Sequence, residues 1–177
     1  MKIDEKTAET DALLEIAKQM CAAVRTAPKA KGIDRISTLI LTGDDKNALA
    51  AEMDRLAEPL GYAFFNRDAE NVRAAGAVVL AGTSEGTSAL GDSCGMCHLQ
   101  NCMRCTEHGG LCAFDPINLG IAIGSAVTVA SSAHVDNRIM FSAGRAALEM
   151  GLFEKKIKII MAIPLSVTGK SPFFDRK

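Results

Sequence analysis

Five of the six cysteines in this 177-residue chain lie in one short segment. They follow the spacing C-x2-C-x4-C-x2-C-x6-C, at Cys94, Cys97, Cys102, Cys105 and Cys112. Thiolates are soft ligands that suit iron–sulfur clusters and zinc. Clustered cysteines in a reducing compartment more often bind metal or do redox chemistry than form disulfides. The spacing therefore predicts a metal or redox site in this segment.

The five cysteines allow several sets of four ligands. Cys94, Cys97, Cys102 and Cys105 form two C-x-x-C pairs. The set Cys94, Cys97, Cys102 and Cys112 resembles the small four-iron modules of certain anaerobic electron-transfer and corrinoid proteins. In those modules the third cysteine opens a helix, so the resemblance implies a short helix over residues 102–107. We favour this second set for a [4Fe–4S] cluster, with Cys105 as a spare thiol beside it.

Zinc is the main alternative occupant of the segment. Two C-x-x-C pairs are also typical of zinc sites, although a linker of four residues is short for zinc knuckles. His98 and His108 lie within the segment and could each replace a cysteine as a ligand. A reactive dithiol without metal is a third interpretation, and it does not explain the presence of five thiols.

The overall composition excludes several classes of partner. The net charge is -1, aromatic residues are 5% and tryptophan is absent, which disfavours a nucleic-acid binder. The polar start, residues 1–11, lacks the features of a secretory signal. The apolar runs 121–130 and 159–165 are short for a membrane span and are expected in the core. We therefore expect a cytoplasmic protein that binds neither nucleic acid nor membrane.

The remaining sequence predicts the elements that position the cysteines. Apolar periodicity indicates helices, and short apolar β-branched runs indicate strands. We expect an α/β (α+β) fold with a sheet covered by helices, as one domain over 1–177, with residues 92–114 inserted as a cysteine module. Cys21 falls on the apolar stripe of the first helix and is expected to be a small core residue. The expected helices are about 10–27, 46–60, 115–127 and 138–151, and the expected strands are 37–42, 62–65, 77–81 and 157–165.

Five segments together resemble an uncharacterised prokaryotic family of ferredoxin-domain-containing proteins. The resemblance extends over nearly the whole chain and implies an iron–sulfur module. Its segments are Arg25–Asp34, Cys94–Cys112, Asp115–Ala126, Val135–Met140 and Ile163–Arg176.

A more distant resemblance concerns the scaffold. The helix that ends at Ala27-Pro28, the strand after it, the helix after Asp44-Asp45 and the final strand near Pro164 are similar in order to nitroreductase-like flavoproteins. This resemblance implies a homodimer with FMN at the subunit interface. The basic residues that could then face a flavin phosphate or another anion are Arg25, Lys29, Lys31 and Arg35, with Arg176 in the tail. Their alternative interpretation is a solvated loop.

The expected function is that of a ferredoxin-type iron–sulfur redox or electron-transfer protein on a nitroreductase-like scaffold. Its expected partner is a redox protein or a small-molecule electron acceptor, and FMN is a second candidate cofactor. The alternatives are a zinc-stabilised structural or interaction protein, and a flavin enzyme in which the cysteine module is regulatory or vestigial.

Overall fold

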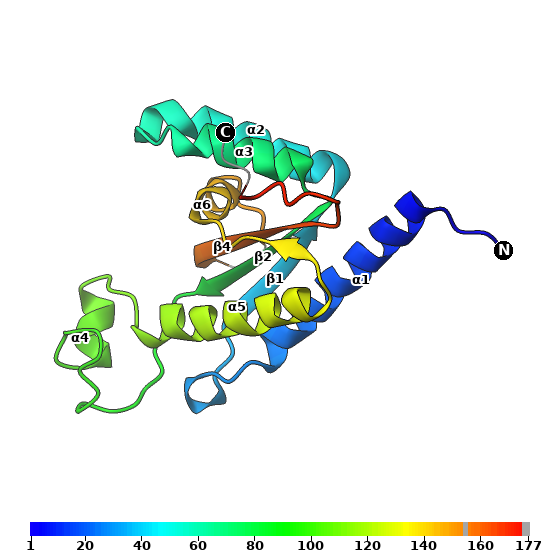
Figure 1. Ribbon diagram of the computed structural model, residues 1–177. Helices are drawn as coiled ribbons and strands as arrows, with labels where there is room; N and C mark the ends of the chain where they lie inside the picture. Colours follow the sequence, from blue (N-terminus) through cyan, green and yellow to red (C-terminus); the bar gives the residue numbers. More distant parts are fainter. Residues whose placement is uncertain (154–155, 175–177) are drawn as a thin grey trace.

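The computed structural model describes residues 1–153 and 156–174. An antiparallel four-stranded sheet in the order β1-β2-β4-β3 lies between two layers of helices (Figure 1). The strands are β1 (Ile36–Leu41), β2 (Ala77–Ser84), β3 (Asp136–Asn137) and β4 (Ile157–Ser166). Three of them confirm expected strands, and the two-residue β3 had no counterpart in the sequence prediction.

The helices divide between the two faces of the sheet (Figure 1). One face is covered by α2, α3 and α6, and the other by α1 and α5, which also pack on each other. The main helices are α1 (Glu5–Thr26), α2 (Gly43–Leu60), α3 (Phe64–Ala74), α5 (Phe114–Ser132) and α6 (Phe141–Glu149). Two short helices, η1 (Ala30–Gly32) and α4 (Cys102–Glu107), lie in connections.

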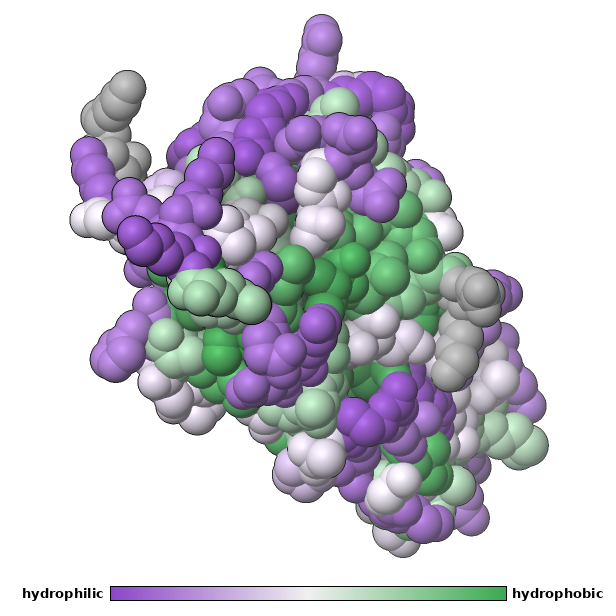
Figure 2. All heavy atoms as spheres, turned by 90° about the vertical axis from the view of Figure 1, so that its right-hand side faces the viewer, coloured by the Kyte–Doolittle hydropathy of each residue, from purple (hydrophilic) through white to green (hydrophobic). Residues whose placement is uncertain are grey.

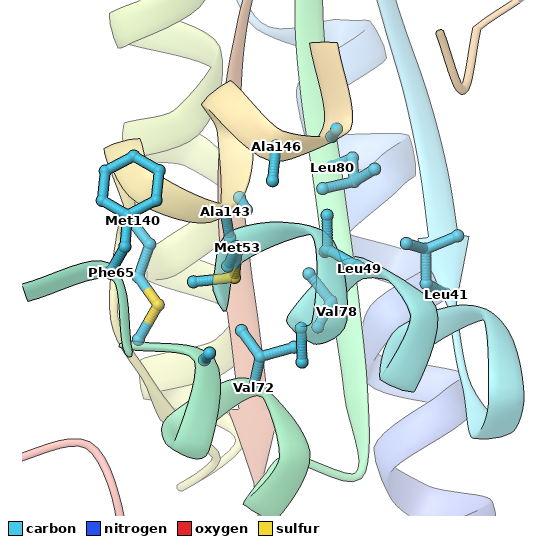
Figure 3. Packing of buried hydrophobic residues seen from close by; sticks show 14 of the residues in the cluster. Leu41, Leu49, Met53, Phe65, Val72, Val78, Leu80, Met140, Ala143 and Ala146 are labelled. Carbon is cyan, nitrogen blue, oxygen red and sulfur yellow. The ribbon is translucent and has the colours of Figure 1, made fainter. Parts of the chain in front are cut away.

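The two faces of the sheet have separate hydrophobic cores. Along β2, Val78 and Leu80 point into the core under α2, α3 and α6, while Val79 and Ala81 point into the core under α1 and α5. This alternation is the period-two pattern of a strand. Because helices cover both faces, every position from 77 to 83 is buried, which explains the continuous apolar run. Figure 3 shows side chains of the first core meeting from five elements: Leu41, Leu49, Met53, Phe65, Val72, Val78, Leu80, Met140, Ala143 and Ala146.

The first helix begins earlier than the periodicity predicts. Asp4 is its N-cap and accepts a hydrogen bond from the Thr7 backbone N–H at 3.0 Å. Residues before Leu13 are exposed, so no apolar stripe marks this part of α1, and only the capping side chain indicates its start. The helix ends before Pro28, as predicted.

The prediction of a strand at 62–65 is wrong, because this segment begins α3. Phe64 and Phe65 favour strands by propensity, but Phe65 is fully buried in the first core as part of a helix. Tertiary packing overrides local propensity here. Asp68 stabilises the helical placement, because its carboxylate accepts a 2.6 Å hydrogen bond from the Ser142 hydroxyl of α6.

The helix α5 is longer than expected. It spans 19 residues, and among the described residues it is the one helix long and apolar enough by composition to cross a membrane. Its buried side chains, such as Leu119, Ala122 and Ala126, pack in the second core against α1 and β2. This packing identifies it as a core helix.

Candidate metal centre

All five clustered cysteines line one cavity beside α4. The cavity is small: its water-accessible volume is about 20 Å³. Its remaining lining is mostly apolar or backbone. The lining residues are Thr87, Cys94, Gly95, Met96, Cys97, Asn101, Cys102, Cys105, Cys112, Ala113 and Phe114.

Short-range hydrogen bonds turn the chain so that the thiols converge. Asn101 caps α4 by accepting the Arg104 backbone N–H at 2.9 Å, and this places Cys102 in the first turn and Cys105 one turn later. Gly95 and Gly109 have positive φ of 60° and 63°, which allows tight turns on either side of the helix. The helix over 102–107 agrees residue for residue with the one implied by the four-iron modules.

Cys105 is the most deeply buried of the five thiols. It is 3% exposed, whereas the other four are partly exposed. A Cβ on Gly110 would stand 3.0 Å from the Cys105 Sγ, so a side chain there would crowd the sulfur. Burial raises the pKa of the Cys105 thiol, and a hydrogen bond with Cys97 and the charges of Cys112 and Cys102 raise it further. Cys105 therefore lies at the same cavity as the other four thiols, and its role as a ligand or a spare thiol stays a prediction.

The two histidines of the segment do not line the cavity. His98 and His108 are both exposed, and the His108 Nδ1 lies 2.8 Å from the Arg104 carbonyl oxygen. Within residues 1–153 and 156–174, no three Cys, His, Asp or Glu side chains are already grouped around a point where a single metal ion would sit. The donors that fit a soft metal or cluster are thus the five thiols of the cavity.

A buried ion pair joins the base of the cysteine module to the sheet. The Arg35 Nη1 lies 3.3 Å from the Asp115 Oδ1, and the Arg35 Nη2 donates to the Thr87 carbonyl. Burial raises the pKa of the Asp115 carboxyl, and it outweighs the opposite effects of Arg35 and of the Gly86 backbone N–H. In the sequence, Arg35 belongs to a basic cluster and Asp115 lies at an expected helix start. Neither local pattern predicts that the two residues pair.

The three residues predicted to bind a flavin phosphate have partners within the chain. Arg25 pairs with Asp34. The Lys29 ammonium donates to the carbonyls of Val24 at 2.7 Å and Arg25 at 2.6 Å, at the end of α1. Burial lowers the pKa of Lys29, and Asp34 partly offsets this. Lys31 donates to the Ala89 carbonyl at 3.0 Å. These side chains hold the loop in place and do not converge on a free anion site.

Two further predicted positions can be placed or set aside. Cys21 is half-buried against the second core, as expected for a small core residue, and burial raises the pKa of its thiol. Arg176 lies outside the described residues.

Several solved structures with a similar fold are nitroreductases. A nitroreductase with bound FMN from Desulfitobacterium hafniense superposes with a TM-score of 0.59 at 13% identity, over 88% of this chain and 78% of the other. The nitroreductase CinD from Lactococcus lactis, in complex with nicotinic acid, superposes with a TM-score of 0.57 at 19% sequence identity. The superposition covers 98% of this chain and 86% of CinD. Nitroreductase A from Vibrio parahaemolyticus superposes with a TM-score of 0.55 at 12% sequence identity. The superposition covers 97% of this chain but only 62% of the length of nitroreductase A. The chain therefore has the mixed α/β nitroreductase-like fold that the sequence predicted.

Sequence comparison gives the closer relationship. An uncharacterized protein from Archaeoglobus fulgidus is 38% identical over 184 aligned residues, which cover 99% of this chain and 98% of the relative. A family model described as "Uncharacterized protein containing a ferredoxin domain (DUF2148)" matches residues 108–176, a stretch that includes Cys112. The chain belongs to this family of ferredoxin-domain proteins.

Proposed function

We propose that this protein is an iron–sulfur electron-transfer protein, with a [4Fe–4S] cluster held by thiolates of the cysteine module. The observation that carries the proposal is the convergence of five cysteine side chains on one largely apolar cavity. The family's ferredoxin domain and the nitroreductase-like fold support a redox role. A bound cluster would exchange single electrons, and the burial and hydrogen bonds around its sulfurs would tune the reduction potential.

The position of Cys105 changes our preferred ligand set. We propose that Cys97, Cys102, Cys105 and Cys112 bind the cluster, because Cys105 is the buried thiol of the cavity that these residues line. Cys94, which lines the same cavity, would then be the additional thiol. Single cysteine-to-serine variants test this set, with iron and acid-labile sulfide measured after anaerobic reconstitution. Loss of the cluster in the Cys94→Ser variant and its retention in the Cys105→Ser variant would restore the set predicted from spacing.

Elemental analysis separates the cluster from the zinc alternative. We expect iron and sulfide in near-equal amounts after anaerobic isolation, and the broad visible absorption of a four-iron cluster. Stoichiometric zinc without sulfide, again after anaerobic isolation, would instead indicate a structural zinc site. A colourless chain that takes up neither iron nor sulfide would contradict the proposal.

The same spectrum tests for flavin. The D. hafniense nitroreductase binds FMN and shares the fold, but Arg25, Lys29 and Lys31 are engaged within this chain. We therefore assign no flavin-binding role to these three residues. A yellow protein that releases FMN on denaturation would show that flavin binds elsewhere.

We also propose that two copies of the chain associate through α5. The outer side of this helix exposes Ile117 and Ile121, which are 40% and 42% exposed. Gly120 and Gly124 lie on the same helix, and a Cβ on either would meet no atom within 4 Å. Small residues on a helix permit close approach of a second backbone. The face shown in Figure 2 carries an apolar area bordered by hydrophilic side chains, which is a feature of surfaces that bind partners.

A further inference from the structure

We propose that Arg35 and Asp115 form a clasp that closes the base of the cysteine module and fixes the position of Cys112 at the cavity. The proposal deepens the proposed function, on which its metal measurements rest. The two residues are 80 positions apart in the sequence, and they come from the segment before β1 and from the first turn of α5. Between them they contact the chain both where it enters the module and where it leaves it.

Arg35 holds the segment that enters the module. Its guanidinium donates to the Thr87 carbonyl and pairs with Asp115. Gly86 lies directly against the arginine: a Cβ at this position would stand 2.0 Å from the Arg35 Nε. Only glycine therefore allows the arginine to reach both partners.

The segment that leaves the module is held through Asp115. Its backbone N–H donates to the Cys112 carbonyl at 2.9 Å, and the Cys112 Sγ lies 3.9 Å from the hydroxyl of Ser88, which is 1% exposed. Thr87 and Cys112 both line the cavity. A displacement of Asp115 would thus move a cavity thiol directly, without involving the other four cysteines.

The carboxylate of Asp115 makes the clasp sensitive to the loss of its arginine. Asp115 is 1% exposed, and its Oδ2 has no hydrogen-bond partner among the described residues. Arg35 supplies the positive charge beside it. Removing the arginine would take away the ion-pair partner of this buried carboxyl and the donor to the Thr87 carbonyl, and breaking a buried pair in this way is strongly destabilising. The base of the module would then open.

The test compares full-length Arg35→Met and Arg35→Lys with the wild type, all reconstituted anaerobically. Arg55→Met is the matched control, because Arg55 is an exposed arginine of α2 that pairs with Glu52, away from the cysteine module. Changes to groups that orient metal ligands typically weaken metal affinity 10–100-fold. We expect Arg35→Met to lose iron to a chelator about 10–100-fold faster than the wild type. We expect Arg35→Lys to lose iron at a rate between those of the wild type and Arg35→Met. We also expect its reduced cluster to give an altered electron paramagnetic resonance spectrum.

Hydrogen exchange of the chain without metal provides a readout independent of iron. We expect faster exchange over residues 86–113 in Arg35→Met and unchanged exchange in β2 and β4. If this variant does not fold, the comparison of Arg35→Lys with the wild type decides in the same way. If residues 86–113 exchange at the same rate in the arginine variants as in the wild type, the proposed clasp is overturned. If the wild type takes up no iron but the variants still exchange faster, the proposed function fails and the clasp stands.

Discussion

Lys46 is a buried cation whose charge is used at the end of a helix. It is 6% exposed, and its ammonium donates to the carbonyls of Val72 at 3.0 Å and Arg73 at 2.8 Å, in the last turn of α3. Cations favour this end of a helix because the last carbonyls lack partners within it. Burial lowers the pKa of Lys46, so the environment partly opposes the charge that the carbonyls require.

We predict that Lys46→Met lowers the free energy of unfolding by about 1–3 kcal/mol, because two carbonyls lose their donor. Methionine preserves most of the apolar stem. Urea denaturation measures the effect, with Lys18→Met on the exposed side of α1 as the control. Equal stability of Lys46→Met and the wild type would mean that burying the charge costs as much as its hydrogen bonds contribute.

Asp34 should make stability depend on pH at the acidic end. Burial alone raises its pKa, but the Ile36 backbone N–H, Arg25 and Lys29 outweigh this and hold the pKa below the ordinary value of 3.8. A carboxyl whose pKa is lower in the folded state stabilises the fold at any pH above its unfolded-state pKa. This stabilisation is lost as the pH falls through the folded-state pKa.

We predict that Asp34→Asn costs about 1 kcal/mol near neutral pH and less in acid. Asparagine can still accept the Ile36 N–H, so the change isolates the charge. Urea denaturation of both proteins at about pH 7 and about pH 3 measures the difference. A difference that stays constant or grows toward acid would rule out this role.

Among the elements, α6 packs closely on the sheet at Gly144. A Cβ at this position would stand 2.0 Å from the Ile160 carbonyl oxygen of β4. Glycine is normally unfavourable within a helix by about 1 kcal/mol relative to alanine. The close packing of α6 on β4 therefore depends on a residue that weakens the isolated helix.

We predict that Gly144→Ala lowers the free energy of unfolding by about 1–3 kcal/mol, despite its better helix propensity. The control is Gly169→Ala, because a Cβ at Gly169 meets nothing within 4 Å. Thermal and urea unfolding should show the loss at position 144 only. Stabilisation by Gly144→Ala would mean that α6 can shift away from β4 at little cost.

The sequence predicted the elements whose local pattern matches their tertiary environment. The apolar runs of β1, β2 and β4 are buried, so local and global preferences agree. The residues at the start of α3 misled the prediction, because Phe64 and Phe65 have the local signature of a strand. The cysteine spacing located the candidate centre, but not the burial of Cys105. The pairing of Arg35 with Asp115 was invisible, because no local pattern reports a contact across 80 residues.

At the scale of the whole molecule, the exposed face of α5 should determine the oligomeric state. We predict a dimer in analytical ultracentrifugation, and a monomer for Gly124→Glu. A Cβ at Gly124 would meet no atom within 4 Å beyond the backbone of its own helix, so circular dichroism should show an intact fold. Gly169→Glu is the matched control in open space. A Gly124→Glu variant that sediments like the wild type would place the contact between copies elsewhere.

The contacts of Arg35 with Thr87 and Asp115 also have a consequence for modularity. The chain leaves β2 and enters α5 beside this one arginine, and neither hydrophobic core draws on residues 85–113, all of which the structure describes. Replacing residues 88–112 with a few glycines would shorten this loop without removing a side chain of either core. The entropic cost of closing the loop on folding would then fall by about 1–2 kcal/mol. The remaining body should fold with Cys21 as its one cysteine.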